Sequence, residues 1–351
     1  MKHWISYLAV VILAMACATE KKQPTEPSPE ITTDWEEVKR PCNAHLRGLD
    51  IAGDGTIWAS GTEGTVLKSA DSGKTWSVYQ IEHARAFDLR DIEAIDSNTA
   101  ITMSSGNGVR MYKTTDGGRQ WSLAYENADS AQFFDALDFN GSVGWAYGDP
   151  QDGAFQLLAS QNQGDSWAVY DANHLPSALS NEGGYAASGT GLILTKSWLG
   201  FAVGGGTHSR FIRAGADSSW QAFVVPMTSS PGAGIFSMAF WSDDAGIAVG
   251  GNYVDSTRSD SNAAYTTDGG IHWNLCQSSP SGYRSCGASN HDGSMLIATG
   301  RTGTDISTDG GKTWQLISEN GYFSAVIIEG QAIGVGRYGK IGVLELEHLT
   351  P

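Results

Sequence analysis

Short β-strands are predicted by the pattern of hydrophobic and polar positions. Apolar and polar residues alternate in segments such as Leu46-Arg-Gly-Leu-Asp-Ile51 and Phe133-Phe-Asp-Ala-Leu-Asp-Phe139. A period of two residues places alternate side chains on opposite faces of a sheet. Two further short apolar runs follow the first segment, Thr56-Ile-Trp-Ala59 and Thr65-Val-Leu-Lys68, and the same grouping recurs along the chain. The pattern therefore predicts an all-β protein with short antiparallel strands.

An octapeptide ending in Trp recurs after these strand groups. Close copies span residues 69–76, 114–121, 266–273 and 307–314, and weaker copies end at Trp167 and Trp220. The shared form, Ser/Thr-x-Asp-x-Gly-x-x-Trp, is the Asp-box or BNR motif. Its Asp is expected to accept hydrogen bonds from turn amides, its Gly to adopt a positive φ, and its Trp to fill space between sheets. Structural roles are therefore predicted for Asp71, Trp76, Asp116, Trp121, Asp268, Trp273, Asp309 and Trp314.

The spacing of the motif predicts a ring of sheets. Successive tryptophans, counted from Trp35, are 41 to 53 residues apart, and each interval holds four predicted strands. Radial repetition of such units is typical of a β-propeller. The last unit ends after its third strand, so the segment around Trp35 is expected to supply the fourth and close the ring. Seven opening strands can be placed, at Leu46, Leu89, Phe134, Gly189, Phe236, Tyr283 and Phe323.

The first 17 residues predict a lipoprotein-type signal peptide. Lys2 precedes an apolar run over residues 5–16 that is too short to span a membrane, and Cys17, the predicted lipidation site, follows small residues. An ordinary signal peptide with an incidental Cys17 is the alternative. Residues 18–33 carry three prolines among polar residues and predict a disordered tether, which leaves residues 34–351 for the propeller. We expect a bacterial cell-envelope protein that contacts the membrane only through its lipid.

Charge and cysteine content exclude several classes of site. The chain has 22 Lys+Arg against 38 Asp+Glu, a net charge of −16, which argues against nucleic-acid binding. Cys42, Cys276 and Cys286 lack metal-ligand spacing, so we predict no metal site and no cofactor. A disulfide between Cys276 and Cys286 across one loop is an alternative to free thiols, although the repeat places them on different strands. A monomer is expected.

Six segments outside the Asp-boxes carry a further resemblance, namely residues 86–94, 132–139, 147–153, 181–188, 234–240 and 282–285. They resemble bacterial homologues of the photosystem II assembly/stability factor propellers. The resemblance extends over essentially the whole predicted propeller. It implies a seven-bladed, envelope-located assembly or binding factor. We expect this chain to be a non-catalytic binding module.

Candidate ligand-binding residues are predicted on one face of the ring. The starts of the innermost strands and the loops between second and third strands open on the face opposite the Asp-boxes. Because blade 7 adjoins blade 1, five arginines are expected in one sector. Arginine binds carboxylate or phosphate through two parallel hydrogen bonds, so the face predicts a protein partner or another acidic ligand. The candidates are Arg47, Arg90, Asp135, Ser237 and Arg284 on opening strands, with Asp149, Arg301 and Arg337 in the loops.

Two other interpretations stay open from sequence. Individual arginines can instead pair with neighbouring aspartates and tie blades together. A glycoside hydrolase resembling sialidases would use an arginine triad, a Tyr nucleophile and a carboxylic acid. The long connection over residues 171–187, which carries His174 and Glu182, is a further candidate functional loop. The residues of the enzyme hypothesis are Arg47, Arg90 and Arg284 for the triad, Tyr322 or Tyr338 as nucleophile, and Asp135 or Asp149 as acid.

Overall fold

The computed structural model describes residues 34–215 and 217–346, together with Met1 and Leu349. Apart from Met1, the predicted signal peptide (residues 1–17, with Cys17) and the predicted tether (residues 18–33) lie outside the described residues. Within the described part, no helix combines the length and apolar character needed to cross a bilayer.

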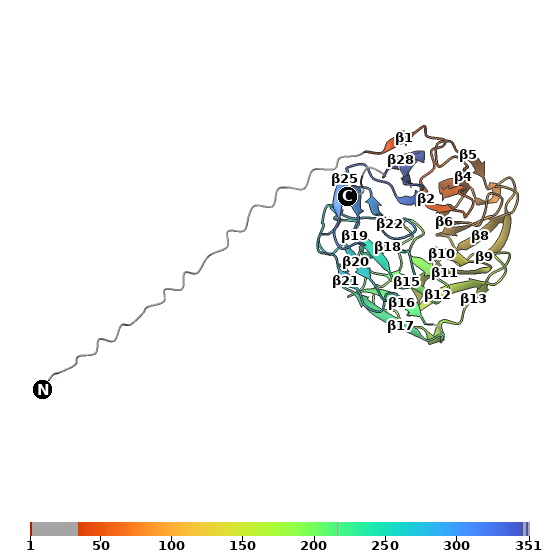
Figure 1. Cartoon of the computed structure of the whole chain (residues 1–351). Coiled ribbons are helices and arrows are strands. Elements are labelled where there is room, and N and C mark those ends of the chain that lie inside the picture. The colour runs from red at the N-terminus through yellow and green to blue at the C-terminus, as the bar shows by residue number, and fades with distance from the viewer. Residues whose placement is uncertain (2–33, 216, 347–348, 350–351) are drawn as a thin grey trace. The chain divides into compact units, whose positions relative to one another are not determined.

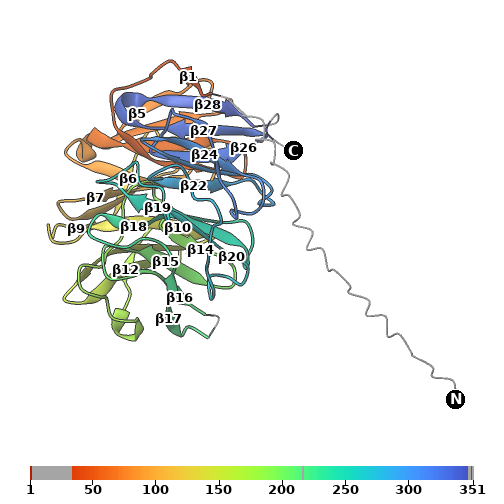
Figure 2. The same ribbon diagram turned by 90° about the vertical axis from the view of Figure 1, so that its left-hand side faces the viewer.

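Seven four-stranded antiparallel sheets surround a central axis, as predicted (Figure 1). In each of the first six blades the strands follow one another from the axis outward in chain order. Figure 2 shows the same ring after a rotation of 90°. Blade 1 contains β2 (Leu46–Ile51), β3 (Ile57–Gly61), β4 (Thr65–Ser69) and β5 (Ser77–Gln80); blade 2 contains β6 (Asp88–Ala94), β7 (Ala100–Ser105), β8 (Val109–Thr114) and β9 (Ser122–Asn127); blade 3 contains β10 (Phe134–Asn140), β11 (Val143–Gln151), β12 (Ala154–Ser160) and β13 (Ala168–Val169).

The remaining blades follow the same order. Hydrophobic clusters fill the spaces between neighbouring sheets, for example between blades 1 and 2 and between blades 4 and 5. Blade 4 contains β14 (Leu192–Leu194), β15 (Leu199–Val203), β16 (Ser209–Ala214) and β17 (Trp220–Val225); blade 5 contains β18 (Ala233–Phe240), β19 (Gly246–Asn252), β20 (Ala263–Thr266) and β21 (Asn274–Leu275); blade 6 contains β22 (Cys286–Ser289), β23 (Leu296–Gly300), β24 (Gly303–Ser307) and β25 (Gln315–Ser318); blade 7 contains β26 (Ser324–Ile328), β27 (Gln331–Val335) and β28 (Ile341–Glu345), with β1 (Glu36–Val38) outermost.

The N-terminal strand closes the ring. β1 pairs antiparallel with β28, and Glu36 faces Val343 in the register. The preceding Trp35 is only 6% exposed; its indole N–H donates to Thr304 Oγ1 in blade 6 at 3.0 Å, and its ring centre lies 4.4 Å from that of Tyr322. The predicted closure is confirmed, and it fastens the first segment of the described chain to the last two blades.

The Asp-boxes form tight turns with one recurrent set of hydrogen bonds. In each close copy the Asp accepts the backbone N–H of the residue four positions later, at 2.9 Å. The Trp indole donates to the carbonyl of the box Gly at 2.8–3.2 Å. That Gly has φ between 80° and 90° in all four copies, which a Cβ would disfavour. These contacts give the box residues a scaffold role.

The box Gly also packs on the preceding blade. A Cβ at Gly270 would lie 2.5 Å from the ring of Phe211, and one at Gly311 would lie 2.4 Å from Ile247. Both distances are far inside van der Waals contact, so a side chain here would push two blades apart. The motif therefore specifies the local turn and the approach of neighbouring sheets together.

The weak copy in blade 4 forms a different turn. It is one residue shorter than the motif, and Asp217 accepts the backbone N–H of Ser219 at 3.0 Å, only two positions on. Trp220 begins β17 itself and is half-buried, with its indole N–H 3.5 Å from the hydroxyl of Tyr170. This Trp lacks the bond that anchors the indole in the four close copies.

Cys42, Cys276 and Cys286 are free thiols in the described structure. The possible disulfide between Cys276 and Cys286 is not formed, because Cys286 opens the inner strand β22 while Cys276 follows the outermost strand of blade 5. The described residues contain no group of three or more His, Cys, Asp or Glu side chains placed to hold a metal ion.

Candidate functional site: a pocket of arginine and aromatic side chains

A segment of the long connection crosses one end of the central channel. We call residues 181–190 the strap. Gly183 exchanges backbone hydrogen bonds with Gly204 of blade 4, and the carbonyl of Ala186 accepts Arg90 Nη1 of blade 2 at 3.0 Å. Ser188 Oγ donates to the carbonyl of Ser285 in blade 6 at 2.8 Å. Since these blades lie on different sides of the ring, the strap spans the channel mouth.

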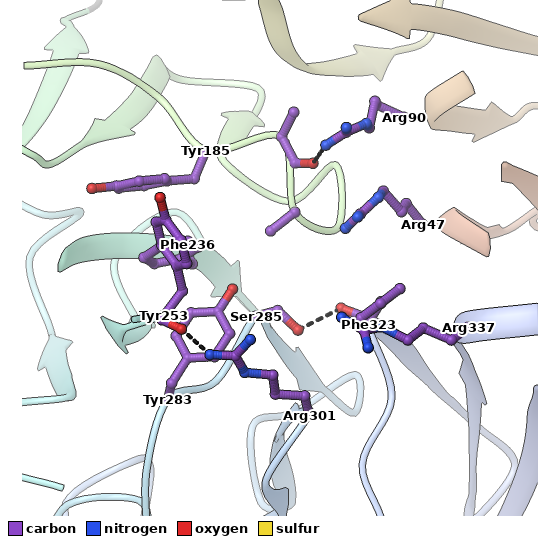
Figure 3. A pocket seen from close by; sticks show the side chains of 12 residues that line it. Arg47, Arg90, Tyr185, Phe236, Tyr253, Tyr283, Ser285, Arg301, Phe323 and Arg337 are labelled. Carbon is purple, nitrogen blue, oxygen red and sulfur yellow. Dashed lines mark hydrogen bonds between the residues drawn. The ribbon is translucent and has the colours of Figure 1, made fainter. Parts of the chain in front are cut away.

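The strap forms one wall of a pocket of about 280 Å³ on this face (Figure 3). The arginines and the aromatic rings lie largely on opposite sides of the pocket, as the close-up shows. Arg47, Arg90 and Arg337 approach from blades 1, 2 and 7. The lining residues are Arg47, Arg90, Tyr185, Ala186, Ala187, Phe236, Tyr253, Tyr283, Ser285, Arg301, Phe323 and Arg337.

Bulges in the innermost strands aim several of these side chains. The register of β2 with β3 shifts between Leu46 and Gly48, which leaves Arg47 as the extra residue. Arg90 and Phe236 occupy the same position in β6 and β18. A bulged residue is released from the alternation of the strand and its side chain is redirected. Three pocket residues therefore owe their direction to a backbone irregularity at the channel mouth.

The cationic side of the pocket carries more positive than negative charge. Asp88 Oδ2 lies 2.6 Å from Arg90 Nε and 4.0 Å from Arg47 Nε, so one carboxylate serves two guanidinium groups. The guanidinium group of Arg337 has no hydrogen-bond or ion-pair partner among the described residues and lies over Phe323, 5.6 Å from the ring centre. Burial, and then the neighbouring Arg90, lower the pKa of Arg47. A bound anion would offset both effects.

The aromatic side is a cluster of packed rings with neutral hydroxyls. Tyr185 stacks on Phe236 with ring centres 3.8 Å apart, and Phe236 meets Tyr283 edge to face at 4.7 Å. Burial raises the pKa of Tyr185 and of Tyr283, so both phenols stay protonated at neutral pH. Arg301 donates to the backbone carbonyl of Tyr253, which fixes that residue at the pocket edge.

Four of the eight predicted face residues meet in this pocket, namely Arg47, Arg90, Arg301 and Arg337. Asp149 lies instead in an adjoining cavity of about 510 Å³ beside the strap. Asp135 occupies the bulge position of blade 3, but the strap covers it and leaves it 1% exposed. The predicted ligand-facing position of Asp135 is therefore wrong.

The predicted position of Ser237 is wrong by one residue. Phe236 holds the bulge of blade 5, whereas the fully buried Ser237 accepts a hydrogen bond from Thr190 at 2.6 Å and one from the Gly287 amide at 2.8 Å. A shift of one position on a strand exchanges the two faces. Phe236 consequently reaches the pocket and Ser237 ties the strap to blades 5 and 6.

Arg284 is also corrected, because it is completely buried. β22 begins at Cys286, so Arg284 lies in the loop before the strand and turns into blade 6. Its Nε and Nη2 lie 2.5 Å from Asp305 Oδ2, and Nη1 donates to Thr302 Oγ1 at 2.8 Å. Arg284 thus has a structural role, but its partner Asp305 belongs to the same blade, so this ion pair does not tie two blades together.

The residues of the sialidase-like arrangement do not come together. Arg284 is enclosed with Asp305, and Tyr322 is buried against Trp35. Asp135 lies beneath the strap. Of the suggested set, Arg47 and Arg90 line the pocket, and Tyr338 is exposed next to the pocket residue Arg337.

Sequence reasoning missed the strap as a wall of the pocket. The two residues singled out on the long connection have other positions: Glu182 is buried and ion-paired with Arg210, and His174 ends a short 3₁₀ helix (Ala172–His174) outside the pocket lining. The missed wall residues are Tyr185, Ala186 and Ala187. Residues 181–188, one of the segments that resemble the photosystem II assembly/stability factor propellers, contain all three and could have indicated this wall.

Comparison with known proteins identifies the repeat and a set of relatives. The BNR/Asp-box repeat family matches residues 305–316, which include the last close copy of the motif. The photosystem II assembly lipoprotein Ycf48 of Synechococcus sp. (strain CC9902) is 26% identical over 229 residues, which are 64% of this chain. The match covers 62% of that relative's own length.

The chain is an Asp-box propeller that resembles Ycf48. Among solved structures, YCF48 from Cyanidioschyzon merolae superposes with a TM-score of 0.63 at 16% identity, covering 89% of this chain and 99% of that one. A structure of YCF48 bound to D1 peptide gives a TM-score of 0.64 at 15% identity, with 92% and 99% coverage. At these identities the solved structures establish the common fold.

Proposed function

We propose that this propeller is a non-catalytic binding protein that holds an acidic segment of a protein partner in the arginine and aromatic pocket. Binding would serve the assembly or stabilisation of that partner. The observation that carries the proposal is the gathering of Arg47, Arg90, Arg301 and Arg337 around one cavity. The chain as a whole has a net charge of −16, so this gathering runs against its overall charge. A carboxylate placed there would complete hydrogen bonds that Asp88 alone cannot supply.

A peptide fits the pocket better than a free anion would. The aromatic side offers the stacked rings of Tyr185 and Phe236, which favour an apolar side chain next to the carboxylate. The relative is named a photosystem II assembly lipoprotein, and a propeller of the same fold was solved with D1 peptide. Both support a protein partner for this chain.

Neutralising two pocket arginines tests the proposal. With a fluorescent decapeptide that contains an Asp-Phe pair as probe, Arg47→Gln/Arg337→Gln should weaken binding about 100-fold or more, because each charge-assisted hydrogen bond contributes about 1.5–3 kcal/mol. Titration by fluorescence anisotropy measures the affinity. The same peptide with Asn in place of Asp should bind wild type as weakly as the Asp peptide binds the variant.

Arg119→Gln is the matched control, since Arg119 is exposed in the Asp-box of blade 2. It should leave peptide affinity unchanged, and thermal unfolding of the double variant should stay close to wild type. Equal affinity of the double variant and wild type would contradict the pocket as the binding site. Turnover of sialosides by the wild-type protein would contradict a non-catalytic role.

We further propose that Cys17 carries a lipid that holds the protein at the cell envelope. The motif around Cys17 and the lipoprotein name of the relative support this. Cys17→Ser should move the full-length protein from the membrane to the soluble fraction of an expressing bacterium, as followed by immunoblot. Cys42→Ser, which removes a thiol inside the propeller, should stay with the membrane. Membrane retention of Cys17→Ser after a carbonate wash would contradict the lipid anchor.

A further inference from the structure

The strap rests directly on carboxyl groups of blades 2 and 3. A Cβ at Gly184 would lie 2.3 Å from Asp135 Oδ2, and one at Gly183 would lie 2.4 Å from Asp149 Oδ1. Further along, a Cβ at Gly189 would lie 2.0 Å from Asp91 Oδ1. Only glycine permits such an approach, so the backbone of the strap itself covers these acids.

Asp135 is the least satisfied of these groups. Both of its carboxylate oxygens are buried, and neither accepts a hydrogen bond of ordinary geometry in the described structure. Asp149, by contrast, accepts the backbone N–H of Gly184 at 3.0 Å, and Asp91 accepts the N–H groups of Ile92 and Leu137 at 2.8 and 2.7 Å. An ionised carboxylate without partners in a closed site is strongly disfavoured.

The surroundings of Asp135 set its protonation. The charged neighbours are Asp149 on β11, which disfavours a second negative charge, and Arg90 on β6, which favours it. The backbone N–H of Ala186 on the strap also favours the ionised carboxyl, by less than these charges do. Two phenols, Tyr147 on β11 and Tyr185 on the strap, also face the two acids and stay neutral. Burial is the largest effect and raises the pKa of Asp135 well above its ordinary value.

We propose that the strap is a proton-controlled wall of the pocket, closed while the Asp135 carboxyl is protonated and displaced when that carboxyl ionises beside Asp149. Two features connect this carboxyl to the pocket. Gly184, which lies against Asp135, is followed at once by the wall residues Tyr185, Ala186 and Ala187. Arg90, which interacts electrostatically with Asp135, also holds the carbonyl of Ala186.

The direction of the pH dependence follows from linkage. In the closed strap Asp135 binds its proton more tightly than it would in an open, hydrated strap, where its pKa would return toward its ordinary value of 3.8. Closure is therefore fully favoured below that ordinary value and is lost as pH rises through the raised pKa. This proposal rests on the proposed function in one respect: the pocket that the strap controls is the proposed peptide site.

Hydrogen exchange of the free, full-length protein tests the proposal without any ligand. After correction for the intrinsic pH dependence of exchange, backbone amides of residues 181–190 should exchange at least about tenfold faster at pH 8 than at pH 5 in wild type, because one unit of pKa shift corresponds to a tenfold change in equilibrium. Asp135→Asn, which mimics the protonated carboxyl, should keep the strap protected at both pH values.

Asp50→Asn is the matched control. Asp50 is a half-buried inner-strand carboxyl with a pKa raised to about 6 by burial, and it accepts the Ala94 N–H in blade 2 without contacting the strap. This variant should keep the wild-type pH dependence at residues 181–190. Protection of the strap that does not change with pH in wild type, or that changes equally in Asp135→Asn, would overturn the proposal.

The peptide probe separates the two proposals. If the pocket binds the Asp-Phe peptide, its affinity for wild type should fall from pH 5 to pH 8, while Asp135→Asn should bind with nearly constant affinity. If the strap responds to pH as expected but no peptide binds at either pH, the proposed function fails and the proton-controlled strap stands. If the peptide binds with the same pH dependence in both proteins, the strap proposal fails and the proposed function stands.

Discussion

Arg284→Met is expected to destabilise the propeller by about 3–5 kcal/mol, since removing one partner of a buried ion pair leaves the other charge uncompensated. Arg284 and Asp305 are both fully buried, and Asp305 Oδ1 also accepts the backbone N–H and the hydroxyl of Ser281. The loss would therefore loosen the loop that precedes β22 as well. Urea unfolding followed by tryptophan fluorescence measures the effect.

A second substitution separates charge from packing. Asp305→Asn keeps an acceptor for Ser281 and removes the orphaned charge, so the double variant Arg284→Met/Asp305→Asn should regain much of the lost stability. Peptide binding should survive in the folded fraction of both variants, because Arg284 lies outside the pocket. A stable Arg284→Met protein that no longer binds peptide would show that Arg284 belongs to the binding site after all.

Trp35→Ala is expected to cost about 3–5 kcal/mol, the usual loss when a buried Trp is truncated. Trp35 sits before β1, fills the space beside Tyr322 and donates to Thr304, so its removal weakens the strand that completes blade 7. Next to it, Asp34 Oδ1 accepts Ser318 Oγ at 2.6 Å. Detachment of β1 would expose the edge of β28, so the variant should also aggregate more readily when warmed.

Trp220→Ala is the comparison for this substitution. Trp220 is half-buried in the divergent box of blade 4 and lies far along the chain from the closure. Its truncation should cost clearly less, and it should not promote aggregation through an open sheet edge. Unfolding midpoints and light scattering of the two variants give the comparison. A smaller loss for Trp35→Ala than for Trp220→Ala would contradict the role of β1 as the closing strand.

The site was only partly predictable because strand bulges decide which residue faces the channel mouth. Counting positions from the start of each repeat located Arg47 and Arg90, which occupy bulges in β2 and β6. The same count selected Ser237 where the bulge falls on Phe236. In blade 6 the strand starts too late to present Arg284 at all. The Asp-box can be recognised from its regular sequence pattern, whereas the position of a bulge has no comparably regular pattern.

The seven blades, the Asp-box turns and the closing strand could all be predicted from the order of residues along the chain. These features depend on short-range chemistry, such as the bond from the Asp309 carboxylate to the Thr313 amide, and short-range chemistry repeats wherever its residues do. The pocket, in contrast, depends on how distant segments pack together in the folded protein. Its wall is a strap from one connection, supported by Asp135 and Asp149 of another blade and held by Arg90 of a third. These contacts join residues that do not occupy equivalent positions in the repeats. The repeat pattern therefore does not predict them.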